Sequence, residues 1–238
     1  MDSFNWAWDA KHQAALDALH AGDVGQAIVL AREAVDAAQA SSVDDAPMSL
    51  DLLATAFMAA GEWSEAIQTL SELLSRGSPV YGRESLIVGA WLVMLGEAHL
   101  RHRDSREAEP LLREGLRVFA FSLAADPVIN DALDTHEMRV FALSLAVGTD
   151  EGVESIRPAH PPEWPTHPAA VRVLFLLATS LNLQEKFQES IRYCNATIAL
   201  VDRLRSLGWE NKNADSCQYQ AEKTKQYATQ QMQNTTAG

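Results

Sequence analysis

The apolar residues of this chain recur at spacings of three and four positions over most of its length. In residues 14–19 and 26–38, Ala, Leu, Ile and Val follow this spacing, which places them on one face of a helix. No segment alternates apolar and polar residues over the length of a strand, and no Asn-Gly or Asp-Gly pair predicts a hairpin. We therefore expect an all-α fold.

Polar breaks separate the helical runs. Short breaks fall at Gly22-Asp23, Gly61-Glu62 and Arg103-Asp104, and longer joins are expected at residues 41–47, 76–83 and 126–127. Residues 157–168 contain five prolines, which remove backbone donors and restrict the preceding residues, so this stretch marks the strongest internal boundary. From Gln218 onward the chain is polar, and we expect a polar C-terminal tail whose last residues fray.

One pattern occurs three times: an apolar helix, a turn, an acidic residue, and Ala four residues after the acid. It spans residues 22–27, 61–66 and 103–108. Glycine at the end of a helix accepts the left-handed conformation, and an acid at the start of the next helix meets unpaired backbone donors. The small Ala allows the two helices of a pair to approach closely.

These segments resemble tetratricopeptide (TPR) repeats. The first-helix pattern of that family is matched at Leu92, Leu95, Gly96 and His99, at Leu50, Leu53, Ala54 and Phe57, and at Leu174, Leu177, Ala178 and Leu181. Residues 107–112 resemble the long-period repeats of kinesin light chains. The resemblance implies a right-handed superhelical stack of antiparallel helix pairs, a TPR-like α-solenoid; an irregular helical bundle is the alternative.

The expected organisation follows from the repeats and the breaks. It comprises an aromatic N-terminal cap in residues 1–9, three TPR-like units in 10–125, a degenerate unit and Pro-rich loop in 126–168, a C-terminal TPR-like helix pair in 169–217, and a polar C-terminal tail in 218–238.

In the TPR family the first helix of each pair lines the concave face and meets the ligand. The resemblance therefore implies a protein or peptide partner, with packing against a neighbouring helix as the alternative role of the same side chains. The implied partner-binding residues are His12, Leu16, Leu19, Asp51, Thr55, Met58, Val93, Glu97, Leu100, Arg101, Arg172, Phe175 and Thr179. The positions at which chaperone-binding relatives grip a C-terminal carboxylate hold His12, Leu16, Leu52, Ala90 and Met94, so we do not expect that clamp.

The net charge of −13 argues against nucleic acid and against anionic membranes, and it makes a basic or apolar peptide the easier partner. Basic residues nevertheless gather in one place, the Arg-rich face, which is either a solvated surface of local ion pairs or a docking surface. Its members are Arg101, Arg103, Arg106, Arg113 and Arg117. The aromatic N-terminus, with Phe4, Trp6 and Trp8, either caps the first pair or contacts another molecule.

The residue types that can act in catalysis or bind metal form no catalytic pattern in the sequence. There is no Gly-rich phosphate loop and no Gly-x-Ser-x-Gly elbow. His160, His167 and Glu163 are too few for a convincing metal site, so we expect neither metal nor cofactor. Cys194 and Cys217 form no paired motif, and the N-terminus lacks a secretory pattern, which favours a cytoplasmic protein.

We therefore expect a non-catalytic interaction module, or scaffold, that binds a peptide or protein segment on the concave face. The alternative is a regulatory or inhibitory subunit of a partner enzyme, such as a protease or a signalling protein, that docks through the Arg-rich face or the aromatic N-terminus. The sequence leaves open whether the chain forms homo-oligomers.

Overall fold

The computed structural model describes residues 6–41, 46–124, 168–206 and 212–236, and all of these form helices or the tight turns between them. The helices are α1 (Trp6–His20), α2 (Val24–Ser41), α3 (Ala46–Ala60), α4 (Trp63–Tyr81), α5 (Leu86–Arg101), α6 (Ser105–Ala124), α10 (Pro168–Leu183), α11 (Phe187–Ser206) and α12 (Lys212–Thr236). The expected all-α fold is confirmed.

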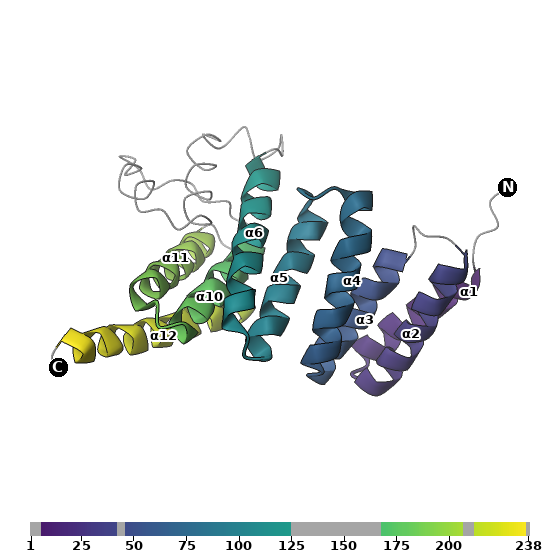
Figure 1. Cartoon of the computed structure of the whole chain (residues 1–238), viewed down its shortest axis with the longest axis horizontal. Coiled ribbons are helices and arrows are strands. Elements are labelled where there is room, and N and C mark those ends of the chain that lie inside the picture. The colour runs from purple at the N-terminus through teal and green to yellow at the C-terminus, as the bar shows by residue number, and fades with distance from the viewer. Residues whose placement is uncertain (1–5, 42–45, 125–167, 207–211, 237–238) are drawn as a thin grey trace.

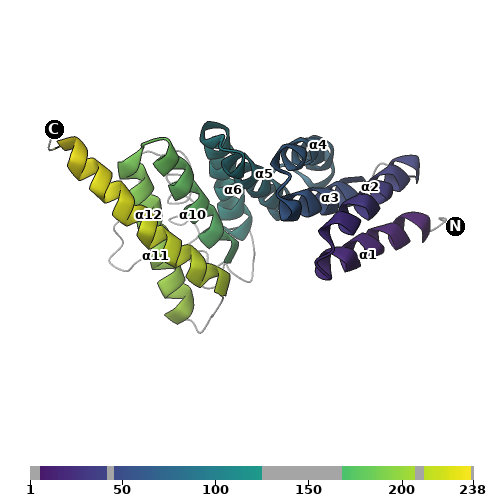
Figure 2. The same ribbon diagram turned by 90° about the horizontal axis from the view of Figure 1, so that it is seen from below.

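The helices stack in chain order along the long axis of the molecule, with the two termini at opposite ends (Figure 1). Each helix from α1 to α6 packs against the next, α10 follows on α6, and α12 packs against both α10 and α11. Figure 2 shows α12 crossing this last pair at the C-terminal end. The arrangement is a solenoid of antiparallel helix pairs, in which each pair contacts mainly its neighbours.

Four elbows between paired helices share one backbone geometry. The turn residue is left-handed in each, with φ of 80° at Gly22, 76° at Gly61, 72° at Arg103 and 62° at Glu185. In every elbow the next amide donates back to a carbonyl five residues earlier, as in Asp104 N to His99 O at 2.8 Å and Lys186 N to Leu181 O at 2.9 Å. This is a Schellman ending, and it satisfies the last carbonyls of the first helix.

The pattern of an acid followed by Ala has a direct structural role. The backbone carbonyl of the acid accepts the first amide hydrogen bond of the second helix: Ala27 N donates to Asp23 O, Ala66 N to Glu62 O and Ala108 N to Asp104 O. The three alanines are fully buried. On the first helices Ala15, Ala54, Gly96 and Ala178 occupy the matching buried position. A Cβ at Gly96 would lie 2.7 Å from Leu112 Cγ, so small residues set the spacing within a pair.

The interior divides into two apolar clusters that meet at α5. One cluster joins α1 to α5 and includes Trp91 and Leu95, whereas the other joins α5 and α6 to α10, α11 and α12 and includes Val93 and Leu100. Because α5 buries residues on opposite sides of its axis, it belongs to both clusters. It is accordingly apolar almost all round.

The join expected at residues 76–83 is shorter than the sequence suggests, because α4 continues to Tyr81 and carries Pro79 inside the helix. Trp91 of α5 lies against Gly77, where an added Cβ would lie 2.3 Å from Trp91 Cζ3. The Trp91 ring also meets Tyr81 edge-on, with ring centroids 5.5 Å apart. We call this contact between α4 and α5 the apolar junction.

The C-terminal residues differ from the polar, fraying tail expected from Gln218, because residues 212–236 form one helix. Ala214, Ala221 and Ala228 recur every seven residues on α12 and are all buried. Tyr227 also packs edge-on against Phe187 of α11, with ring centroids 6.4 Å apart. A narrow stripe of small residues thus fixes a helix whose remaining surface is polar. No described helix is long and apolar enough to cross a bilayer.

Candidate functional site

A groove opens where α3, α5 and α10 come together. Its cavity volume is about 620 Å³, within the range of small-molecule and peptide pockets. It is lined by Thr55, Met58 and Ala59 of α3, Trp63 of α4, Ala90, Val93, Met94, Glu97 and Arg101 of α5, Phe119 of α6, and Arg172 and Val173 of α10. The lining is mostly apolar, with three charged side chains. We refer to this space as the groove.

Helix α5 contributes the largest share of the lining. Ala90, Val93, Met94, Glu97 and Arg101 follow each other at spacings of one, three and four residues, so they lie on one face of the helix. Small Ala90 leaves space in the floor, and the flexible thioether of Met94 gives a surface that adapts to different apolar side chains. The groove therefore combines an open floor with adaptable walls.

The charged corner of the groove is organised around Glu97, whose side chain is only 7% exposed. Arg172 of α10 donates to its carboxylate through Nε at 3.1 Å and also through Nη2. Arg101 lies one helical turn away, with Nη2 3.8 Å from the same carboxylate. The Arg101 guanidinium also lies over the Trp63 ring, 5.9 Å from its centre. One buried carboxylate is thus shared by two arginines.

Six of the expected partner-binding residues line the groove together. They are Thr55, Met58, Val93, Glu97, Arg101 and Arg172. The structure brings them together from three helices: α3 and α5 precede residues 125–167 in the sequence, and α10 follows them. Their role in binding a partner is taken up below as a proposal.

The other seven expected residues lie outside the groove lining, and several pack inside the molecule. Leu16 and Leu19 pack against the N-terminal apolar cluster, and Phe175 packs against the C-terminal one. Leu100 is 9% exposed and belongs to the C-terminal cluster. Thr179 donates its hydroxyl to the Phe175 carbonyl at 3.0 Å, within its own helix. Leu16, Leu19, Leu100 and Phe175 thus make packing contacts, Thr179 bonds within its own helix, and the role of these residues in binding a partner stays a prediction.

The two titratable members of this second group are partly buried. Burial raises the pKa of Asp51, and a hydrogen bond from the Trp91 indole opposes this shift. Burial also lowers the pKa of His12, against an opposing effect of Asp9, and the His12 ring lies 5.2 Å from the Trp8 ring. In both groups burial thus shifts the pKa in the direction that stabilises the neutral form.

Six lining residues were not among the predicted set: Ala59, Trp63, Ala90, Met94, Phe119 and Val173. Ala90 and Met94 could have been found, because each lies one helical turn from a predicted residue on α5. Trp63 and Phe119 belong to second helices, where the family pattern implies no ligand contact. Val173 follows the predicted Arg172 directly.

The Arg-rich face separates into different environments. Arg117 pairs with Glu114 at 2.6 Å and Glu84 at 3.4 Å, and Arg101 lines the groove. Arg113 is only 15% exposed and lies inside the stack, where it donates to Glu109 Oε1 from Nε at 2.9 Å. Local pairing, rather than one continuous docking surface, describes Arg113 and Arg117.

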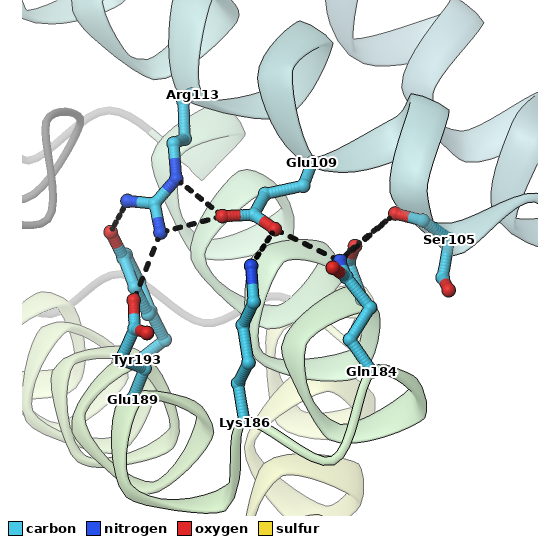
Figure 3. A network of polar contacts seen from close by, with 8 residues as sticks. Ser105, Glu109, Arg113, Gln184, Lys186, Glu189 and Tyr193 are labelled. Carbon is cyan, nitrogen blue, oxygen red and sulfur yellow. Dashed lines mark hydrogen bonds and ion pairs between the residues drawn. The ribbon is translucent and has the colours of Figure 1, made fainter.

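Arg113 and Glu109 are the centre of a polar network that joins α6 to α10 and α11, shown in Figure 3. Glu109 accepts from Lys186 Nζ at 2.8 Å and from Gln184 Nε2 at 2.9 Å. Arg113 donates to the Tyr193 hydroxyl at 2.8 Å and to Glu189 at 3.1 Å. These residues lie between 75 and 80 positions apart in the chain. We call this contact the polar junction.

Opposing effects act on the pKa of Glu109. Its burial disfavours the charged form, but hydrogen bonds from Lys186, Arg113 and Gln184 outweigh burial, so the pKa lies below its ordinary value. The buried Tyr193 has a pKa raised to about 12, chiefly by burial, and it remains a neutral acceptor for Arg113. The polar junction is therefore built for an ionised Glu109.

Ser64, His102 and Asp104 form a hydrogen-bonded chain that no sequence pattern predicts. His102 Nε2 lies 3.2 Å from Ser64 Oγ, and His102 Nδ1 lies 2.8 Å from Asp104 Oδ2. The order of groups is that of a serine-hydrolase triad, but the three side chains are exposed. In bulk water, donors and dipoles stabilise charge weakly, so we interpret the chain as a link between consecutive elbows.

The N-terminal aromatic residues are described in part. Trp8 donates its indole N–H to Ser49 Oγ at 2.6 Å and so ties α1 to α3. This contact matches the capping alternative for Trp8, whereas Phe4 and the side chain of Trp6 lie outside the described part of the chain. His160, His167, Glu163 and the degenerate unit also lie outside them.

Metal and thiol chemistry find little support in the part of the chain that the structure describes. Within these residues no group of three His, Cys, Asp or Glu side chains could hold a metal ion. Cys194 and Cys217 are both free thiols. Burial raises the pKa of Cys194 to about 11, so this thiol is a poor nucleophile.

Comparison with known proteins gives the following matches. Residues 45–120 match the family model described as tetratricopeptide repeat. No curated protein matches the chain. A crystal structure of nearly identical TPR-like repeats from a putative kinesin light chain of Podosopora anserina is 20% identical, covers 84% of this chain and 97% of its own, and has a TM-score of 0.49. BtubC (BKLC) from P. vanneervenii is 18% identical, covers 83% and 80%, and has a TM-score of 0.43.

Proposed function

Because residues 45–120 are tetratricopeptide repeats, as the resemblance implied, we propose that the chain is a non-catalytic interaction module that binds a peptide or protein segment in the groove. The observation that carries the proposal is the groove itself. It is a mostly apolar cavity formed largely by first helices, within and next to the matched repeats.

The shape of the groove supports a segment of polypeptide as the occupant. It runs from α3 across α5 to α10, and so it spans consecutive helix pairs of the stack. Met58 and Met94 lie in the lining and can adapt to apolar side chains of a bound segment. An apolar lining with a few charged groups at one side is typical of peptide-recognition grooves.

The regulatory or inhibitory alternative has less support on the Arg-rich face. Docking through that face would have to break the pairs of Arg113 and Arg117 with the chain's own carboxylates. Breaking the partly buried pair of Arg113 would remove one of the cations that compensate Glu109, which also pairs with Lys186. A regulatory role exerted through the groove is compatible with our proposal, and both free thiols favour action in the reducing cytoplasm.

Binding to an array of random 12-residue peptides tests the proposal. Fluorescently labelled wild-type protein should retain a reproducible set of peptides, and Met58→Arg should lose most of them because a charged side chain enters the apolar lining. Val29→Arg is the matched control, since Val29 is 51% exposed on α2 and lies outside the groove. Circular dichroism must show that both variants fold.

Two results would overturn the proposal. One is a folded Met58→Arg variant that keeps the wild-type peptide set. The other is a Val29→Arg variant that loses as many peptides as Met58→Arg, because binding would then depend on general surface charge rather than on the groove.

A further inference from the structure

We infer that Arg101 and Arg172 form a carboxylate subsite in the groove, and that the bound segment carries an acidic group beside an apolar side chain. The inference rests on the proposed function and adds the chemistry of the partner. It reverses the expectation from net charge, which favours a basic or apolar peptide.

The first argument is local charge. Glu97 carries one negative charge, whereas Arg101 and Arg172 carry two positive charges, so the three charged residues of the groove lining sum to +1. Elsewhere the chain is strongly acidic, with a net charge of −13. A positive spot at the end of an apolar cavity favours the carboxylate of a bound segment and disfavours a lysine or arginine.

The second argument is how differently the three groups are exposed. The Glu97 side chain is 7% exposed, but those of Arg101 and Arg172 are 62% and 54% exposed. The buried carboxylate therefore holds the inner edges of two guanidinium groups whose other parts face solvent. A single arginine would compensate Glu97, and the second cation exceeds what the carboxylate requires.

The third argument is pre-organisation. Two hydrogen bonds to Glu97 orient Arg172, and the Trp63 ring lies under the guanidinium of Arg101. A guanidinium group held in this way loses little conformational entropy when it binds a second carboxylate. Arg–carboxylate hydrogen bonds are also among the strongest in proteins, because both partners are charged and the geometry can be bidentate.

The apolar part of the subsite completes the recognition. Met58, Met94 and Phe119 line the same cavity as the two arginines. A segment that places a Leu, Ile, Met or aromatic side chain among these residues has its neighbouring residues within reach of the arginines. We therefore assign an acidic residue, or a terminal carboxylate, to a position next to the buried apolar side chain.

The random peptide array also tests this inference, through the composition of the peptides that bind. Peptides retained by the wild type should be enriched in Asp and Glu several-fold over the library. Arg172→Met should abolish that enrichment and weaken a retained acidic peptide roughly 10-fold, since one charge-assisted contact is lost. Arg205→Met is the control, because Arg205 is 48% exposed on α11 outside the groove.

Glu97→Gln separates recognition from a purely structural role of the arginines. It removes the competing carboxylate and raises the local charge from +1 to +2, so acidic peptides should bind more tightly. If the three residues only hold helices together, Glu97→Gln and Arg172→Met should both weaken binding. Peptides attached through their N-terminus have a free terminal carboxylate, whereas peptides attached through their C-terminus do not. Comparing the two sets distinguishes a terminal carboxylate from a side-chain carboxylate.

Three outcomes separate this inference from the function on which it rests. Peptides that depend on Met58 but lack acidic enrichment would overturn the carboxylate subsite and keep the peptide groove. Acidic enrichment that persists in Arg172→Met would also overturn the subsite. Peptide binding that is unchanged in Met58→Arg would overturn both the carboxylate subsite and the peptide groove.

Discussion

The apolar and polar junctions join helix pairs in opposite ways. At the apolar junction, Trp91 fills the space left by Gly77, and the fit depends on shape. At the polar junction, Glu109 and Arg113 bind two side chains of α11 and two of the turn between α10 and α11, and the fit depends on charge and hydrogen bonds. The first joins helices adjacent in sequence, and the second joins helices on either side of residues 125–167.

This difference shows what each junction requires of the chain. Helices connected by a short turn need only complementary surfaces, because the turn already limits how they can meet. Helices far apart in sequence can slide or rotate over an apolar face more easily, and directional hydrogen bonds specify one arrangement. This specifying role of the polar junction is a hypothesis, and substitutions at both junctions test it.

Trp91→Ala should have the largest effect. Trp91 is 4% exposed, and its removal leaves a cavity against Gly77 and Tyr81, so we expect about 3–5 kcal/mol of lost stability. Urea unfolding followed by circular dichroism measures the loss. A cost below that of Arg113→Met would show that the apolar junction is not the stronger of the two.

Arg113→Met should rank second, at about 2–3 kcal/mol, because it leaves Glu109 and Tyr193 without their shared donor. Arg117→Met is the matched control, since Arg117 is more exposed and forms pairs at the surface, which contribute little. Equal costs for the two variants in urea unfolding would contradict a special role for the polar junction.

The contributions of Glu109 at the polar junction and of Asp51 beside Trp91 to folding stability should change with pH in opposite directions. The pKa of Glu109 is lowered, so its contribution to stability is complete above its ordinary value of 4.5 and is lost as pH falls through the folded-state pKa. Glu109→Gln should therefore be less stable than wild type at pH 7, by about 1 kcal/mol, and the gap should close in acid.

Asp51 beside Trp91 should behave in the reverse way. Its pKa is raised, so the folded state favours the protonated form and stability declines as pH rises above its ordinary value of 3.8. Asp51→Asn should be at least as stable as wild type at pH 7, and any advantage should shrink in acid. Thermal melting of wild type and both variants between pH 2 and pH 7 measures these differences in stability, and differences of the same sign would refute the contrast.

Substitutions at the left-handed elbow residues should have the smallest effect on folding stability. Glu185→Gly and Arg103→Gly should each gain about 1 kcal/mol, because a left-handed φ strains a residue that carries a Cβ. Gly22→Ala should lose a similar amount for the same reason. Melting temperatures test both directions, and a loss on Glu185→Gly would show that its side chain contributes more than the strain costs.

The helix pairs were the most predictable part of the fold. Apolar spacing located the helices, and the pattern at residues 22–27, 61–66 and 103–108 located three elbows that the structure shows in the same geometry. These features depend on neighbours in sequence, which is why one sequence sufficed. The helix at residues 212–236 escaped the prediction because its buried stripe consists of three alanines in an otherwise polar segment.

The groove was predictable only in part. Its α5 wall follows from helical spacing, but Phe119 enters from a second helix through tertiary packing. The shared carboxylate of Glu97 could not be foreseen, because Arg172 lies 75 positions away and no local pattern connects them. Net charge predicts a basic or apolar partner, whereas the charges within the groove lead us to propose an acidic one, because a sum over the whole chain does not describe one cavity.

The end of the stack at α12 has a consequence for self-association. Either end of a solenoid presents a helix to which another copy could add, and repeated addition would build a filament. The exposed face of α12 carries Glu222, Gln226, Thr229, Gln230 and Gln233. A copy stacked on this face would have to bury amides and a carboxylate, which costs free energy unless each finds a partner. We therefore expect these polar side chains to disfavour head-to-tail stacking on this face, although the rings of Tyr219 and Tyr227 are exposed on the same helix.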